Sequence, residues 1–90
     1  MPMLVTRLKV KDFAVWKQGF DGGKALRDNA GLTNPRIFRS ADDASQVVIL
    51  MDAADIAKAK SFASSPELKA RMAAIGVADT PDFYFLNPAG

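Results

Sequence analysis

The sequence predicts an α+β domain in which helices cover one face of a small antiparallel sheet. Strand-like segments rich in β-branched or aromatic residues alternate with segments whose apolar residues recur at helical spacing. The most informative segment is residues 47–51, Val-Val-Ile-Leu-Met, which is apolar without interruption. Because successive side chains of a strand point to opposite faces, a strand here has two faces to keep from water.

The chain is too short to cover both faces of such a sheet with its own helices. It has 90 residues, of which 49% are hydrophobic and 24% charged, as in ordinary globular proteins. We therefore expect a single domain, residues 1–90, that pairs with a second copy of itself through the uncovered sheet face.

Four strands are predicted. The second and third form a hairpin around a polar turn at residues 40–45, and Pro35 near the start of the second strand favours an edge position. The strands are residues 3–10, 33–39, 46–51 and 82–87.

The first helical segment is predicted from residue 13 to about residue 30, with Asp12 as its N-cap. Phe13, Trp16 and Phe20 share one face of it. The pair at positions 22 and 23, Gly-Gly, costs about 1–2 kcal/mol of helix propensity relative to alanine. A break, a kink or a close contact is expected there.

The second helical segment is predicted from residue 53 to 63, with Asp52 and Asp55 as a capping box. Ser65 and Pro66 then restart a helix that ends at Gly76.

The order strand–helix–strand–strand–helix–strand, with right-handed crossovers, predicts a ferredoxin-like βαββαβ arrangement with a four-stranded antiparallel sheet. The first and third strands are then central, in agreement with the unbroken apolar run. Val48 and Leu50 should face the partner subunit, or Val47, Ile49 and Met51 if the parity is reversed.

The residue types exclude several chemistries. The chain has no His and no Cys, so imidazole bases, histidine–metal sites and thiolate nucleophiles cannot be built. The acid pairs Asp42–Asp43 and Asp52–Asp55 are interpreted as a turn and a helix cap. We expect no metal and no cofactor.

No nucleic acid or membrane partner is expected. The net charge is only +2, and basic residues are interleaved with acids. The RNA-recognition module has this topology, but it stacks bases on aromatic residues of its central strands, and residues 47–51 contain none. No apolar run approaches the ~20 residues of a membrane span. A cytoplasmic location is expected.

Five residues are candidates for a site. Trp16 is interpreted chiefly as core, with ligand lining as the alternative. Tyr84 lies between two phenylalanines, so it should point to the uncovered face if they pack under the helices. Arg36 should face the partner, either in an ion pair, which we favour, or bound to an anionic ligand group. Asn34 is a weaker candidate of the same kind, as is Arg7.

The sequence resembles a known family along nearly its whole length. The opening Arg-Leu-Lys-Val-Lys-Asp-Phe-Ala-Val-Trp-Lys at residues 7–17, the Ser-Pro-Glu-Leu at residues 65–68 and the closing strand at residues 81–86 resemble small proteins of the dimeric α/β-barrel superfamily, near the antibiotic-biosynthesis-monooxygenase-like group.

The resemblance implies a homodimer in which two sheets pack face to face into a barrel with a cavity. Many relatives carry a histidine near the positions of Leu8 and Gly23, so histidine-dependent activity, haem degradation above all, is not carried over. The expected function is binding of a small, largely apolar molecule in the barrel cavity. The alternative is a cofactor-independent monooxygenase or cyclase-like enzyme acting on an aromatic or polyketide-like substrate.

Overall fold

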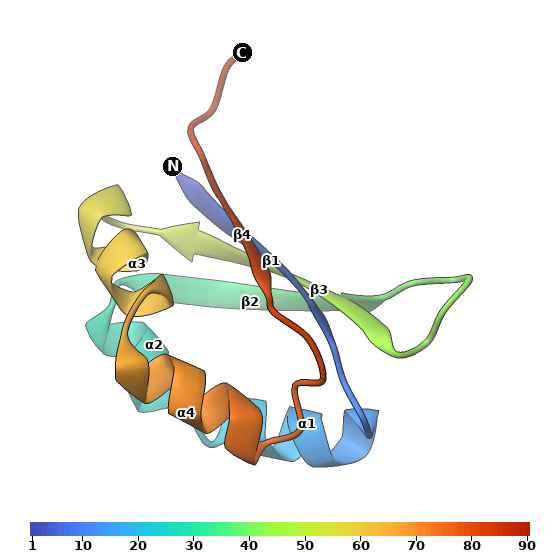
Figure 1. The fold of residues 1–90 in the computed structure, drawn as a ribbon. Coiled ribbons are helices and arrows are strands. Elements are labelled where there is room, and N and C mark those ends of the chain that lie inside the picture. The colour runs from blue at the N-terminus through green and yellow to red at the C-terminus, as the bar shows by residue number, and fades with distance from the viewer.

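The computed structural model describes all of residues 1–90 and places every helix on one side of a four-stranded antiparallel sheet (Figure 1). The strand order is β2-β3-β1-β4, so the predicted central strands are confirmed. The elements are β1 (Met3–Lys9), α1 (Phe13–Asp21), α2 (Lys24–Asn29), β2 (Leu32–Arg39), β3 (Gln46–Ala53), α3 (Ile56–Ala63), α4 (Pro66–Ala74) and β4 (Asp82–Leu86).

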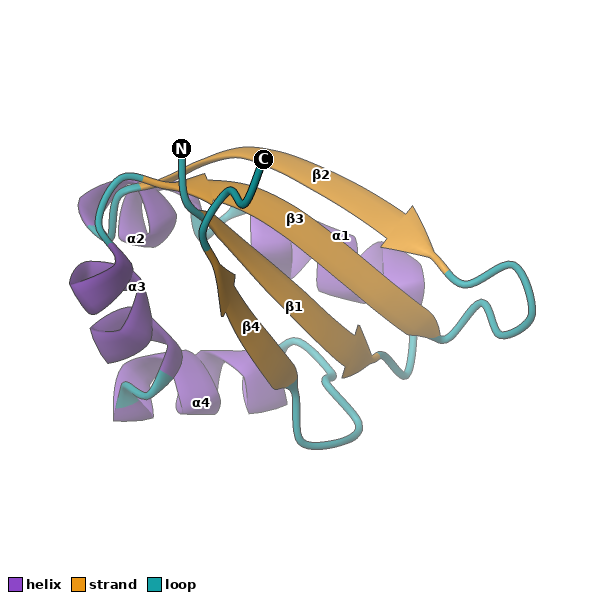
Figure 2. Cartoon of the chain, turned by 90° about the horizontal axis from the view of Figure 1, so that it is seen from above, coloured by secondary structure: helices purple, strands orange, loops and turns teal.

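The sheet has one covered face and one open face. Seen from above, the strands lie in front of the helices, and no element covers the strands from the viewer's side (Figure 2). In β3, Val47, Ile49 and Met51 are buried beneath the helices, while Val48 and Leu50 are half-buried on the other face. The first of the two predicted parities is therefore the one observed.

Side-chain caps fix where the helices begin. Asp12 accepts a hydrogen bond from the Val15 N–H at 3.2 Å, and Ser65 accepts one from the Leu68 N–H at 3.2 Å, with Pro66 in the first turn. Both predicted caps are confirmed. None of these helices is long and apolar enough to cross a membrane.

The predicted start of the third helix was wrong. The helix begins at Ile56, and Asp55 alone caps it by accepting from the Ala57 and Lys58 N–H groups. Asp52 instead belongs to β3, where it pairs with Met3 and Thr33 across the sheet. Ala53 is completely buried under the helices, and its burial favours a strand that continues past the predicted end at residue 51.

The double glycine breaks the first helical segment, as predicted. The chain leaves α1 at Asp21 and enters α2 at Lys24. Farther back in α1, Gly19 lets this helix pack tightly on the end of α4, since a Cβ there would lie 2.3 Å from Ile75 Cγ2. The absence of a side chain therefore sets the distance between α1 and the end of α4 within the helical layer.

Candidate functional site

An apolar cavity of about 60 Å³ lies between the sheet and the helices. Twelve of its 16 lining residues are hydrophobic. They include Trp16 and Phe20 of α1, Met51 of β3, Phe62 of α3 and Met72 of α4. The cavity is smaller than the ~150 Å³ that holds a benzene ring in an engineered protein, but the unbranched methionines that line it can adjust.

Two arginines border this cavity. Arg27 of α2 is only 8% exposed, and its guanidinium carbon lies 3.7 Å from the centre of the Phe20 ring. Its Nη1 donates a hydrogen bond to the Phe20 carbonyl. Arg71 of α4 is half-buried, and its Nη2 donates to the Gly19 carbonyl at 2.7 Å. Both side chains are thus held by the last turns of α1.

The electrostatic setting of Arg27 is unusual for a buried cation. Burial lowers the pKa of Arg27, Arg71 lowers it further, and Asp21 and Asp28 raise it in part. Both carboxylates are already engaged, because Lys17 pairs with Asp21 and Lys24 pairs with Asp28, each at 2.7 Å. A guanidinium keeps its proton at neutral pH, so the site carries positive charge without a paired acid.

The open sheet face is a second candidate surface. Phe38 and Tyr84 are each 54% exposed, and Leu86 is 46% exposed. With the half-buried Val48 and Leu50, they form a largely apolar face. Tyr84 points to this face as predicted, because its neighbours in the strand pack under the helices.

Asn34 and Arg36 meet at Asp52 on the open face. Arg36 Nη2 donates to Asp52 Oδ1 at 3.0 Å, and Asn34 Nδ2 donates to Asp52 Oδ2 at 3.3 Å. Arg36 Nε also donates to the Asn34 carbonyl at 3.3 Å. Arg36 therefore forms an ion pair, as favoured from the sequence, but within its own chain.

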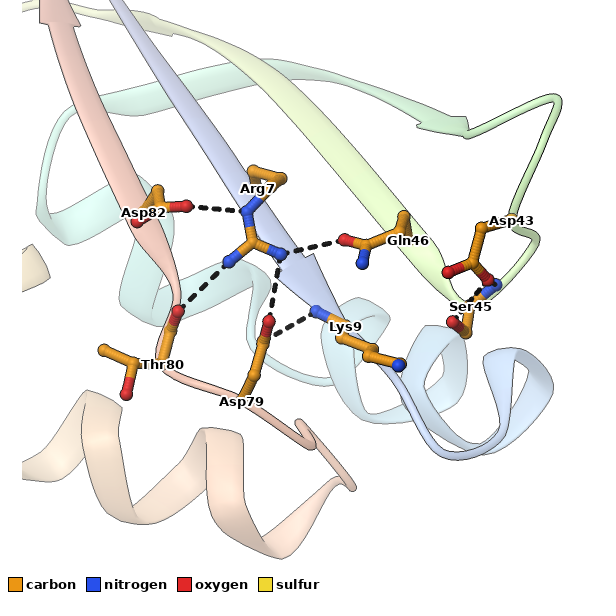
Figure 3. Close-up of polar contacts among 8 residues, drawn as sticks. All are labelled: Arg7, Lys9, Asp43, Ser45, Gln46, Asp79, Thr80 and Asp82. Atoms are coloured by element: carbon orange, nitrogen blue, oxygen red, sulfur yellow. Dashed lines mark hydrogen bonds and ion pairs between the residues drawn. The ribbon is translucent and has the colours of Figure 1, made fainter.

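Arg7 joins β1 to β3 and β4 at one end of the open face (Figure 3). It donates to Asp82 Oδ2 at 2.7 Å, to Gln46 Oε1 at 2.8 Å and to Asp79 Oδ2 at 3.0 Å. The hydrogen bonds to Asp82 and Asp79 raise the pKa of Arg7, and the Lys9 backbone N–H lowers the pKa of Asp79. With its donors occupied, Arg7 acts as a structural clamp.

The predicted site residues separate into two groups. Trp16, 1% exposed, lines the internal cavity. Arg36, Asn34 and Tyr84 lie on the opposite side of the sheet, the first two on edge strand β2 and the third on edge strand β4. The fold brings Asn34 and Arg36 together and keeps Trp16 away from them.

Sequence reasoning missed Arg27 and Arg71. The spacing of Arg27 from Phe20 gave no signal, because the two residues belong to different helices, α2 and α1. Nothing local marks Arg71, which approaches Arg27 only because α4 packs on α1. No group of three or more acidic side chains that could hold a metal ion occurs in the structure.

Comparison with known proteins gives a result at the level of the fold. No protein-family model and no curated protein matches the sequence. A candidate antibiotic biosynthesis monooxygenase from Bordetella bronchiseptica has a TM-score of 0.78 at 14% identity, covering 98% of this chain and 96% of that one. SnoaB, a cofactor-independent oxygenase from Streptomyces nogalater, has a TM-score of 0.73 at 15% identity, covering 99% and 93%.

A third structure agrees with these two. A candidate antibiotic biosynthesis monooxygenase from Caulobacter crescentus has a TM-score of 0.72 at 21% identity, covering 99% of this chain and 90% of that one. Identities of this size establish the fold and not the activity. The chain therefore has the ferredoxin-like fold of the antibiotic-biosynthesis-monooxygenase-like proteins, the group that its sequence resembles.

Proposed function

We propose that this protein binds a small, largely apolar molecule in the cavity between its sheet and its helices. The observation that carries the proposal is the lining, in which Trp16, Phe20 and Phe62 stand among twelve hydrophobic residues. A cavity with such walls gains free energy by exchanging water for an apolar ligand. The site differs in place from the barrel cavity expected between two sheets, because it lies within one protomer.

We further propose that the working form is a homodimer joined through the open sheet face. Phe38, Tyr84 and Leu86 leave a large apolar area in water, and such areas commonly mark interfaces. The charges on this face are paired within the chain, Arg36 with Asp52 and Arg7 with Asp82. A second copy can therefore cover the face without burying an unpaired charge. A cytoplasmic location stays a prediction.

Binding is tested with a neutral aromatic probe, benzyl alcohol, in a two-dimensional NMR titration. We expect the signals of Trp16, Phe62 and Met72 to shift. Leu68→Trp, which replaces a leucine that lines the cavity with a larger indole ring, should abolish the shifts. Leu86→Trp makes the same exchange on the open face and should leave them unchanged. Shifts confined to the open face in the wild-type protein would overturn the proposed binding place.

A second candidate is cofactor-independent oxygenation of an aromatic substrate. It is supported by the likeness to SnoaB, which is described as a cofactor-independent oxygenase and is matched over 99% of this chain. In such a reaction a phenol and O₂ give a quinone and water, with one oxygen atom kept in the ring product and the other leaving as water. Oxygen uptake with 1-naphthol measures it directly. Uptake no faster than in protein-free buffer argues against this activity for simple phenols.

A further inference from the structure

Two guanidinium groups converge on Gly23, between α1 and α2. A Cβ at this buried position would lie 3.1 Å from Arg71 Nε and 3.3 Å from Arg27 Nη1. The backbone of Gly23 has a φ of −93°, which any residue adopts, so conformation does not demand glycine here. What glycine provides is room for the two arginines to approach each other.

The two cations face each other without a carboxylate between them. Neither Arg27 nor Arg71 has an acidic oxygen within 4.0 Å, whereas the neighbouring lysines of α1 and α2 both do. One nitrogen of each arginine donates a hydrogen bond to a backbone carbonyl of α1. No buried side-chain nitrogen lacks a partner, so the remaining donors of Arg27 and Arg71 are open to solvent or to an incoming group.

The pair stands at the edge of the apolar cavity, since Gly23, Arg27 and Arg71 all line it together with Trp16 and Phe20. A ligand in the cavity therefore meets apolar walls over most of its surface, with Arg27 and Arg71 as the charged residues of the lining. We propose that Arg27 and Arg71 form an anion-recognition subsite, and that the ligand is amphipathic, with an apolar ring and one carboxylate or similar oxyanion. The inference rests on the binding function proposed above.

The geometry suits an oxyanion in particular. Guanidinium groups offer planar, parallel N–H donors that match the two oxygens of a carboxylate. Phe20 holds the Arg27 guanidinium at 3.7 Å, and the Gly19 carbonyl holds that of Arg71. Donors that are held in place before binding lose less entropy on meeting the ligand. The same bonds also fasten α2 and α4 to the end of α1, so a test must separate recognition from stability.

The test compares benzoate with benzamide, which have nearly the same shape and differ in charge. Binding is followed by the NMR signals of the cavity residues at low salt. In the wild-type protein we expect benzoate to bind about tenfold more tightly than benzamide, as one charge-assisted hydrogen bond supplies. Arg71→Met should remove this preference and leave benzamide binding unchanged. Lys69→Met, which removes the same charge from an exposed site on the same helix, should keep it.

A second variant tests the subsite independently, in case Arg71→Met unfolds the protein. Gly23→Ala keeps both arginines but pushes their guanidiniums apart, so it should weaken benzoate binding severalfold without affecting benzamide. Equal affinity of the two probes in the wild-type protein would overturn the subsite and leave apolar binding standing. If benzamide fails to bind while benzoate shifts only exposed surface residues, both the subsite and the proposed binding function are wrong.

Discussion

Arg36 and Tyr84 lie in one cross-strand row at opposite edges of the open face. Arg36 is opposite Leu50, Leu50 is opposite Val5, and Val5 is opposite Tyr84. Three strand spacings separate the row's ends, about 14 Å. The Arg36 guanidinium is bonded to Asp52 at its own edge of the sheet, away from Tyr84. The centre of the row, Leu50 and Val5, is apolar and suited to pack against another sheet.

The residue in the middle of that row offers a test of the proposed dimer. Leu50→Glu places a charge at the centre of the proposed interface, where it has no partner, and burying an unpaired charge is strongly unfavourable. We expect light scattering at micromolar concentration to give a dimer for the wild-type protein and a monomer for this variant. Val15→Glu changes a 55% exposed residue of α1 and should remain dimeric. A monomeric wild-type protein contradicts the proposal.

Gly19 is expected to be intolerant of any side chain. A Cβ there would lie 2.3 Å from Ile75 Cγ2 and 2.8 Å from Ile75 Cβ, so α1 and α4 must separate. Overpacking of this kind costs roughly 1–3 kcal/mol, and alanine's helix propensity returns about 1 kcal/mol. Urea unfolding should show a net loss for Gly19→Ala.

Gly22→Ala is the matched control for this loss. It lies at the end of the same helix with helical dihedral angles, and the shortest contact of its Cβ would be with the end of the Arg71 side chain, at 3.2 Å, which needs a shift of only a few tenths of an ångström. We expect its free energy of unfolding to stay level or to rise by up to about 1 kcal/mol. An equal loss in both variants would show that the Gly19–Ile75 contact is not the cause.

Asn34 has a φ of +53°, in the left-handed region. It sits at the irregularity between Thr33 and Arg36 where β2 slips its register against β3. Asparagine tolerates this conformation and glycine prefers it, whereas a β-branched residue is strained by roughly 1–2 kcal/mol. Thermal unfolding should therefore find Asn34→Gly close to the wild-type protein and Asn34→Val clearly less stable. Similar melting temperatures for the two variants would contradict this explanation.

The Asp79 carboxylate should make the free energy of unfolding depend on pH. The Lys9 backbone N–H, and then the Arg7 side chain, lower the folded-state pKa of Asp79. A carboxyl whose pKa is lowered by folding adds stability above its unfolded-state pKa and loses it as the pH falls through the folded-state pKa. The stability difference between the wild-type protein and Asp79→Asn should thus shrink in urea titrations carried from neutral to strongly acidic pH.

The effect should be modest, because the Asp79 side chain is 35% exposed and partly screened by water. Asp42→Asn is the control, since the Asp42 carboxylate accepts no hydrogen bond within the chain. A gap between wild type and Asp79→Asn that is the same at every pH would mean that the contacts of Asp79 do not depend on its charge.

Much of the fold was predictable because alternation and helical spacing report directly on which side chains are buried. The unbroken run at residues 47–51 indicated a central strand, and its position and parity follow the prediction. The role of Asp52 as a helix cap was predicted wrongly because its spacing to Asp55 is that of a capping box. Its actual partners, Asn34 and Arg36, lie 18 and 16 residues away in sequence.

The candidate site was less predictable for a physical reason. The approach of Arg27 to Arg71 is created by three helices packing around Gly23, and no local pattern encodes such a meeting. Trp16 was identified by helical spacing, but that spacing is the same for a core residue and for a residue lining a cavity. Distinguishing the two required the shape of the space beside it.

The internal pairing of charges on the open face has a kinetic consequence. Arg36 and Arg7 form ion pairs with carboxylates of their own chain, so two protomers approaching to form the proposed dimer would exert little directed electrostatic attraction on each other. Their encounter is then governed by diffusion and by the fraction of collisions with matching orientation, with rate constants of about 10⁵–10⁷ M⁻¹s⁻¹. The association rate of the proposed dimer should be nearly the same in dilute buffer and at high ionic strength.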